Sequence, residues 1–196
     1  MILEHAQDPF TLFSIWFNEA EASEPADPNA MTLATVNKDG VPSARIVLMR
    51  SVSEDGFEFF TNYQSHKGED LKANPRACLN FYWKSLGRQV RITGTVEALP
   101  ATDSDAYFAT RPRRSQLGAW ASQQSRPLES YEALMQALEE NEKKYEGKDV
   151  PRPPHWGGYR VIPEQIEFWQ GETNRLHQRI RFLRSTGGWQ KQWVNP

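Results

Sequence analysis

The segment IEFWQGETNRLHQRIRF, residues 166–182, has the pattern of a strand, a tight turn and a second strand. Five of its side chains could contact a ligand: Trp169, Arg175, His177, Arg179 and Arg181. A flat aromatic ring, an imidazole and three guanidiniums on one turn suit a planar, anionic molecule. The alternative is an exposed hairpin whose arginines face water, and charge content alone favours it. The rest of the chain decides between the two.

Short strands recur along the chain and end at turn residues. Strands are expected at residues 31–36, 43–52, 57–61, 77–83, 88–99, 158–169, 179–184 and 189–194. Tight turns at 37–40 and 53–56 join the first three, which predicts an antiparallel meander. The run 46–49 is continuously apolar, so the strand 43–52 is expected to be buried on both faces.

Helices are expected at the N-terminus and between the strands. Asp8 followed by Pro9 is typical of a helix start, and an acidic loop at 19–29 should follow this first helix. Its apolar side would hold Phe10, Phe13, Ile15, Trp16 and Phe17. Further helices are expected at residues 65–73, 103–110, 115–123 and 130–145.

These elements predict one domain over residues 1–196, of a mainly β (α+β) class. Its parts are an N-terminal helix and loop (1–29), inserted helices (100–150) and C-terminal strands (158–196). Eight or so short, mostly antiparallel strands indicate a closed or nearly closed β-barrel with peripheral helices.

Composition excludes several classes of protein. The formal net charge is −2 and the pI about 6.1, whereas a nucleic-acid binder would carry a basic excess. The single cysteine, Cys78, cannot form an internal disulfide, and the four histidines lack metal-site spacing. There is no signal peptide and no apolar run of about 18 residues. We therefore expect a cytoplasmic protein that binds no metal, nucleic acid or membrane.

Two arginines flank the apolar run in the strand 43–52. Arg45 and Arg50 are five residues apart, so on one strand their side chains would point to opposite faces. They could bind anions at the mouth of a barrel, or they could be rim charges.

Other residues have the chemistry of a phosphate site. Ser65 and Lys67 lie at a predicted helix start, where free N–H groups and the helix dipole favour anions. Tyr107, Arg111 and Ser115 are spaced by four residues and would share one helical face, although the proline after Arg111 predicts a break there. An ordinary cap and solvated cations are the alternatives in both places.

Gln89, on a predicted strand, could hydrogen-bond the edge of a heteroaromatic ring, since its amide both donates and accepts. No phosphate-binding loop, dinucleotide-binding or nucleophile-elbow motif occurs in the chain. The candidate residues therefore fit flat, anionic ligands better than hydrolysis.

The sequence resembles the pyridoxine (pyridoxamine) 5′-phosphate oxidase family over nearly its whole length. The matching blocks are RIVLMR at 45–50, FFTN at 59–62, SHKG at 65–68, RQVRITGTVE at 88–97, YFATRPRRSQLGAWASQQS at 107–125, PPHWGGYRV at 153–161, QIEFWQG at 165–171 and RLHQR at 175–179. The resemblance implies an antiparallel, Greek-key split β-barrel and a homodimer with two FMN molecules at its interface. The implied reaction oxidises pyridoxine or pyridoxamine 5′-phosphate to pyridoxal 5′-phosphate, with hydride passing from C4′ to flavin N5 and O2 becoming H2O2.

The resemblance also implies roles for individual residues. FMN contacts are implied for Arg45, Ile46, Val47, Leu48, Met49, Arg50, Phe60, Thr61, His66, Lys67 and Gln89 and, from the partner subunit, for Gln124, Ser125, Trp169 and Arg179. The substrate phosphate would contact Arg50, Tyr107, Arg111 and Ser115. Arg175 and His177, the implied catalytic residues, would contact the pyridine ring.

Four features depart from the family pattern. Arg50 stands where lysine is usual, and its forked side chain changes the phosphate contact. His66 stands where arginine is common, which makes that contact pH-dependent. Gln178 replaces the usual aspartate between His177 and Arg179. The N-terminal basic arm of some family members is also expected to be missing.

Two other functions stay open at this point. One is a related flavin oxidase that acts on another substrate, such as a phenazine precursor, and the other is a non-catalytic module that binds flavin or pyridoxal phosphate. The set Tyr107, Arg111 and Ser115 favours a phosphorylated substrate. The departures at Arg50 and Gln178 favour the non-catalytic module.

Overall fold

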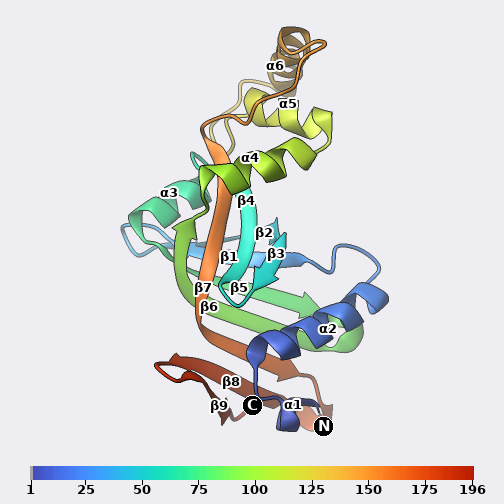
Figure 1. Ribbon diagram of the computed structural model, residues 1–196, viewed down its shortest axis with the longest axis vertical. Coiled ribbons are helices and arrows are strands. Elements are labelled where there is room, and N and C mark those ends of the chain that lie inside the picture. Colours follow the sequence, from blue (N-terminus) through green and yellow to red (C-terminus); the bar gives the residue numbers. More distant parts are fainter. Residues whose placement is uncertain (1) are drawn as a thin grey trace.

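One curved antiparallel sheet forms the centre of the molecule (Figure 1). The computed structural model describes residues 2–196, and Met1, the first residue of the predicted N-terminal segment, lies outside them. The strands are β1 (Ala30–Val36), β2 (Pro42–Leu48), β3 (Ser51–Ser53), β4 (Gly56–Asn62), β5 (Arg76–Trp83), β6 (Arg88–Ala98), β7 (Trp156–Gln170), β8 (Gln178–Ser185) and β9 (Gly188–Trp193). They pair in the order β2-β1-β5-β6-β7-β4-β3, with β8 added to β7 and β9 to β8.

The strands β2 and β3 follow each other in sequence but stand at opposite ends of this order. The chain crosses between the two edges at Met49 and Arg50. The Met49 N–H donates to the Asn29 carbonyl oxygen (2.9 Å) just before β1, and the Arg50 N–H donates to the Glu58 carbonyl oxygen (2.8 Å) in β4. The sheet therefore curves until its edges approach each other, which confirms the predicted barrel of antiparallel strands with peripheral helices.

Two predictions for this region are wrong. The strand expected at 43–52 is two strands, and β4 pairs with β3 and β7 rather than with β2, so the first strands do not form a meander. This segment is also not buried on both faces: in the described structure β2 pairs with β1 alone, and Ile46 is 63% exposed. An apolar run on an edge strand can line a ligand cavity or a subunit contact as well as a core.

Strand β7 joins the barrel to the C-terminal hairpin β8–β9. It pairs with β6 along most of its length, while its first half pairs with β4 and its second half with β8. The register of β6 shifts at Gly94, where a Cβ atom would lie 1.9 Å from the Ile162 carbonyl oxygen. Glycine alone permits this approach, and the resulting bulge marks the change from the barrel half to the hairpin half of β7.

Helix α2 (Pro9–Ser23) packs against the aromatic core of the barrel. Asp8 caps it by accepting a backbone N–H at 2.7 Å, and Pro9 occupies the first turn, as predicted. The ring of Phe13 makes edge-on contacts with Phe57 and Phe81, with centroid distances of 5.0 and 5.3 Å. These contacts tie the helix to strands β4 and β5.

Two details of α2 differ from the prediction. Ile15 is 40% exposed and Leu12 is buried instead, because Ile15 lies about 200° around the helix from the buried Phe13. The helix also continues to Ser23, into the predicted loop 19–29. Ala20 is fully buried and keeps this last turn packed against the core.

The other helices are α1 (Ile2–His5), α3 (His66–Ala73), α4 (Ala101–Thr110), α5 (Arg113–Ala121) and α6 (Tyr131–Lys144), with 3-10 turns at Lys84–Leu86 and Thr173–Arg175. Helices α3 to α6 confirm the four predicted after the first, and α4 ends before Pro112 as expected. Figure 1 shows α4, α5 and α6 beyond one end of β7, with the hairpin β8–β9 at the other end. No helix within residues 2–196 is long and apolar enough to cross a membrane.

Candidate functional site

A cavity of about 850 Å³ lies between strand β2, the end of β4 and helices α3, α4 and α5. Its volume is in the range of small-molecule sites. It is lined by Ser43, Ala44, Arg45, Ile46, Val47, Leu48, Arg50, Phe60, Thr61, Asn62, His66, Lys67, Tyr107, Arg111, Ser115, Gly118, Ala119, Ser122, Gln124, Ser125 and Trp156. This set contains three arginines and a lysine but no carboxylate, so the cavity suits an anionic ligand.

Most of the residues predicted for the site line this one cavity. Arg45 and Arg50 both do, which corrects the expectation that they point to opposite faces. Strand β2 ends at Leu48, so the alternation of side chains does not continue to Arg50. Met49 is the member of the 45–50 block that does not line the cavity, because its side chain is buried. Gln124 and Ser125, which the resemblance assigns to the partner subunit, line the cavity of their own chain.

Arg45 is fixed by a buried polar network behind the cavity wall. Its guanidinium donates to the hydroxyl oxygens of Thr35 (2.7 Å) and Ser43 (2.5 Å) and to a β1 carbonyl oxygen (3.2 Å). Both hydroxyls donate in turn to Asp70, which lies 3.7 Å from Arg45. Burial lowers the pKa of Arg45, and Asp70 opposes this change. Burial would raise the pKa of Asp70, but the two hydroxyl hydrogen bonds and the nearby cations lower it overall.

Lys67 lies in the first turn of α3 and is almost fully buried. Its Nζ donates to Gln124 Oε1 (3.0 Å) and to Ser65 Oγ (3.3 Å). The Thr61 hydroxyl donates to the same Gln124 oxygen (3.3 Å). Burial, together with the charge of Arg45, lowers the pKa of Lys67 to about 8. A phosphate between these two cations would stabilise the charged ammonium, so this end of the cavity fits one.

Gly68 brings α3 close to the loop that precedes it. A Cβ atom on Gly68 would lie 2.0 Å from the Tyr63 carbonyl oxygen, so another residue would push the helix away. The N-cap Ser65 accepts the Gly68 N–H in this turn. The close packing holds the helix N-terminus, with His66 and Lys67, at the cavity.

Arg111 and Arg50 form a second group of cations in the cavity. The Arg111 Cζ atom lies 4.6 Å from the Trp156 ring centre, and the Arg50 Cζ atom lies 5.7 Å from that of Tyr107. Burial lowers the pKa of Arg111; Tyr107 opposes this and the charge of Arg50 adds to it. The Arg111 Nη1 atom is buried and has no hydrogen-bond partner within the described residues. A ligand oxygen would satisfy that donor, and Ser115 lines the same cavity.

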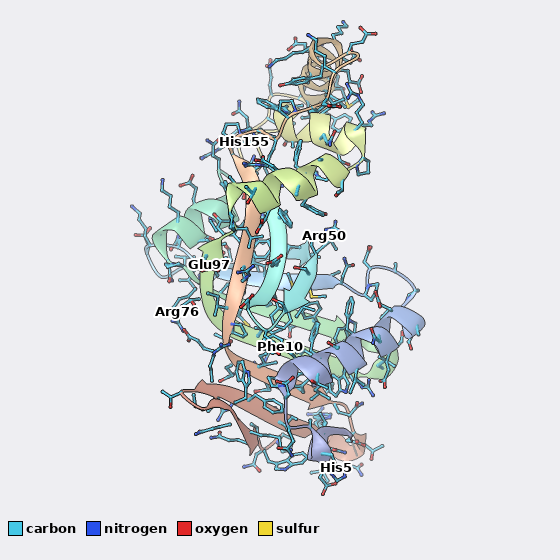
Figure 2. All side chains as sticks on the ribbon, viewed as in Figure 1. His5, Phe10, Arg50, Arg76, Glu97 and His155 are labelled. Atoms are coloured by element: carbon cyan, nitrogen blue, oxygen red, sulfur yellow. The ribbon has the colours of Figure 1, made fainter. Side chains whose placement is uncertain are left out.

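The remaining predicted residues lie outside this cavity, on the β7–β8 hairpin and the neighbouring strand β6. They are Gln89, Trp169, Arg175, His177 and Arg179. Trp169 is opposite Gln89 on one side and Arg179 on the other, and its ring centre is 4.7 Å from that of His177. Arg50 lies near α4, whereas β8 lies at the other end of the molecule (Figures 1 and 2). A single chain therefore does not bring the two groups of residues together.

The turn before β8 has an unusual backbone. Asn174 and Arg175 have φ values of +57° and +62°, which cost a non-glycine residue about 1–3 kcal/mol each. The Glu172 N–H donates to His177 Nδ1 (3.1 Å), and the Gln178 amide donates to the Glu172 carboxylate (2.8 Å). A ring nitrogen that accepts an N–H carries no proton, so the ring proton of His177 is on Nε2.

Arg179 is held by Glu167, a buried carboxylate on β7 for which the sequence analysis predicted no role. Arg179 Nη2 and Nε donate to Glu167 Oε1 at 2.8 and 3.2 Å, and Arg91 Nη2 donates to Glu167 Oε2 at 2.9 Å. Asp70 was missed in the same way. The signal for Asp70 was its spacing of four residues from His66 on one helix. The signal for Glu167 was its position two residues before Trp169, on the same face of a strand.

No group of three His, Cys, Asp or Glu side chains in residues 2–196 could hold a metal ion. The donor set of the cavity, with its arginines, lysine, hydroxyls and amides, is one for phosphate and other oxyanions.

The curved sheet with adjoining edges, its peripheral helices and this cavity define a split β-barrel protein. PhzG from Burkholderia lata 383, solved in complex with tetrahydrophenazine-1-carboxylic acid, is 32% identical, with a TM-score of 0.92 over 98% of this chain and 94% of that one. A pyridoxamine 5′-phosphate oxidase-related, FMN binding protein from Nostoc punctiforme has the same fold at 16% identity, with a TM-score of 0.76 over 97% and 100% of the two chains.

Family models cover almost the whole chain. The model described as pyridoxamine 5′-phosphate oxidase matches residues 17–145, and that of the pyridoxine 5′-phosphate oxidase C-terminal dimerisation region matches residues 156–196. The pyridoxine/pyridoxamine 5′-phosphate oxidase of Azorhizobium caulinodans is 54% identical over 193 residues, 97% of this chain and 91% of that protein. That of Gloeothece citriformis is 57% identical over 187 residues, 95% and 86% of the two chains.

The chain belongs to the pyridoxamine 5′-phosphate oxidase family and is an oxidoreductase. The match of its C-terminal strands to the dimerisation region supports a homodimer.

Proposed function

We propose that this protein is an FMN-dependent oxidase that converts pyridoxine 5′-phosphate or pyridoxamine 5′-phosphate to pyridoxal 5′-phosphate. The observation that carries the proposal is two pairs of cations in one cavity without a carboxylate: Arg45 with Lys67, and Arg50 with Arg111. Each pair suits one phosphate group. The first would bind the phosphate of FMN and the second that of the substrate.

Bound FMN would accept a hydride from the substrate and pass the electrons to O2. The chain itself would supply binding and orientation. Lys67 and Arg45 would hold the cofactor phosphate at the N-terminus of α3, with Gln124 fixing the ammonium of Lys67. The remaining cofactor contacts proposed on this side are Ile46, Val47, Leu48, Met49, Arg50, Phe60, Thr61, His66 and Ser125, of which all but Met49 line the cavity.

The substrate phosphate would lie between Arg50 and Arg111, with hydroxyl contacts from Tyr107 and Ser115. The Nη1 of Arg111, which has no hydrogen-bond partner among residues 2–196, supports this assignment, because a phosphate oxygen would satisfy it. The same set argues against a substrate without a phosphate.

A homodimer would complete the site. The dimerisation region contains the hairpin residues that lie outside the cavity of their own chain. We propose that Trp169 and Arg179, with Gln89 from β6, contact the FMN bound to the partner chain. Arg175 and His177 would contact the pyridine ring there. With its proton on Nε2, His177 would donate a hydrogen bond to the substrate, as would Arg175. Two-fold symmetry makes the two sites equivalent.

The second candidate function is oxidation of a phenazine precursor. It rests on the likeness to PhzG, whose complex contains a carboxylic acid in place of a phosphorylated compound. Purified protein should be yellow, and pyridoxine 5′-phosphate added without air should bleach the flavin. A yellow protein that is bleached by a tetrahydrophenazine-type compound but by neither B6 phosphate would favour the second function.

Mixing two variants at a limiting FMN concentration tests the shared site. At that concentration Lys67→Met would leave the cavity of its own chain without FMN, and Arg175→Ala would disable the hairpin that serves the partner's cavity. A heterodimer of the two variants has one intact site, so random exchange of subunits should restore about a quarter of the wild-type activity. If each site were built from one chain, mixing would restore nothing.

A further inference from the structure

We propose that Glu167 is a positioning residue for the flavin site and acts through Arg179. The inference rests on the proposed function, in which Arg179 contacts FMN. Glu167 does not line the cavity and would not touch the cofactor itself. Its role would be to fix the plane of the Arg179 guanidinium and to offset part of its positive charge.

Arg179 is held through all three of its nitrogen atoms. Nε and Nη2 donate to one oxygen of Glu167, and Nη1 donates to the Asn195 carbonyl oxygen at 2.9 Å. These contacts fix the guanidinium plane. Three of the five N–H groups of an arginine are used in this way, so two stay available for a ligand. A guanidinium fixed in advance loses less conformational entropy when it binds.

Glu167 accepts from Arg91, its direct neighbour on β6, but on the β8 side it contacts Arg179 diagonally rather than its direct neighbour. In the strand register Glu167 lies opposite Arg181, while Arg179 lies opposite Trp169. Arg181 nevertheless donates to Gln192 on β9, and its Nε is buried with no hydrogen-bond partner in residues 2–196. Simple neutralisation of buried charge would pair the carboxylate with Arg181. The geometry instead directs it to the arginine assigned to the flavin.

The charges of Glu167 and its two arginine partners also point to a role for Glu167 at Arg179. Glu167 is 3% exposed and is shared between Arg179 and Arg91, so the three groups together carry one positive charge. A buried ion pair is seldom more stable than a well-packed apolar residue, so the fold alone gives little reason for a carboxylate here. The orientation of Arg179 for ligand binding gives a reason for the carboxylate of Glu167.

The test compares FMN binding with stability in the full-length dimer. Glu167→Gln keeps the shape of the side chain but removes its charge and weakens its hold on Arg179. The dissociation constant for FMN, measured by fluorescence on the apoprotein, should rise on the order of ten- to a hundred-fold. The midpoint potential of the bound flavin should also become more positive, because Arg179 loses its counter-charge. Glu167→Asp keeps the charge and should recover most of the affinity.

Glu164→Gln is the matched control, because Glu164 lies on the same strand and pairs with the exposed Arg76. It should leave the FMN affinity and the flavin potential unchanged. The inference is overturned if Glu167→Gln binds FMN like the wild type, if it changes only the melting temperature, or if neither Glu167 variant folds. A wild-type protein that does not bind FMN would instead refute the proposed function, which separates the two failures.

Discussion

Lys67 and Gln124 are 57 residues apart in the sequence, and the Lys67 Nζ donates to the Gln124 Oε1 atom across 3.0 Å. The contact connects the N-terminus of α3 to the segment that follows α5. The two walls of the cavity are therefore joined through a cation that is buried and whose pKa is lowered to about 8. Binding of an anion, protonation and local packing should all be coupled at this one side chain.

Replacing Lys67 tests the cofactor end of the cavity. Lys67→Met should raise the FMN dissociation constant on the order of ten- to a hundred-fold, because a hydrogen-bonded charge is lost. Turnover at saturating FMN should change much less. Lys72→Met is the matched control, since Lys72 lies exposed on the same helix. Equal losses of affinity in the two variants would contradict a phosphate site at Lys67.

The same residue predicts a pH dependence. The pKa of Lys67 lies below its ordinary value of 10.5, so between pH 8 and 10.5 the unfolded chain binds more protons than the folded one. The contribution of Lys67 to the free energy of unfolding of the apoprotein should therefore increase with pH across this window. FMN affinity should instead fall as pH rises through about 8, because an anion needs the protonated ammonium. Urea unfolding and FMN titrations of wild type and Lys67→Met across this window measure both effects, and the variant should lack them.

Arg111→Lys tests the substrate end of the cavity. Lysine keeps the charge but loses the forked donors and the flat contact with Trp156. We expect the KM for pyridoxine 5′-phosphate to rise roughly ten-fold, with FMN affinity unchanged. Arg114→Lys, at an exposed position outside the cavity, should have wild-type kinetics. A variant at Arg111 that loses FMN and keeps its KM would assign this arginine to the cofactor.

Gly68→Ala tests the packing beneath Lys67. The new methyl group would overlap the Tyr63 carbonyl oxygen, so the variant should lose about 1–3 kcal/mol of stability and bind FMN more weakly. Gly187→Ala should be nearly neutral, because a Cβ at Gly187 meets no atom within 4 Å. Denaturant unfolding and FMN titration of both variants measure the two effects. Undiminished stability of Gly68→Ala would mean that α3 can move away from the loop without cost.

Gln178→Asp tests the turn that carries Arg175. Here Gln178 donates to the Glu172 carboxylate, and an aspartate would replace this hydrogen bond with repulsion between two carboxylates. We expect turnover to fall about five-fold, equivalent to roughly 1 kcal/mol, with little change in FMN affinity. Adding Glu172→Gln should restore activity, because the pair could again share a hydrogen bond. If the double variant were no better than the single one, the effect would not come from this contact.

Local signals in the sequence predicted most of the secondary structure. Asp8 and Pro9 begin a helix and Pro112 separates two, because caps and prolines act over one turn. The division of 43–52 at Met49 and Arg50 could not be predicted in this way. Both sides of it are strand-like, and only the closing of the barrel decides that β2 pairs with β1 and β3 with β4.

The candidate site could also be predicted only in part. The resemblance to a family indicated its residues, but not which of them lie together in one chain. Gln124 was expected to serve a partner subunit and lies beside Lys67 in its own chain. Glu167 was passed over because a glutamate within a strand usually faces water, and its burial depends on arginines from β6 and β8.

The crossing of the chain between the two edges of the barrel also sets a distance. Arg45 and Arg50 belong to the two cation pairs, and only four residues separate them in the sequence. A backbone of that length spans at most about 18 Å when fully extended. The backbone of segment 45–50 therefore limits the distance between the two anion sites. It also limits how far apart the phosphate groups of two bound molecules can lie.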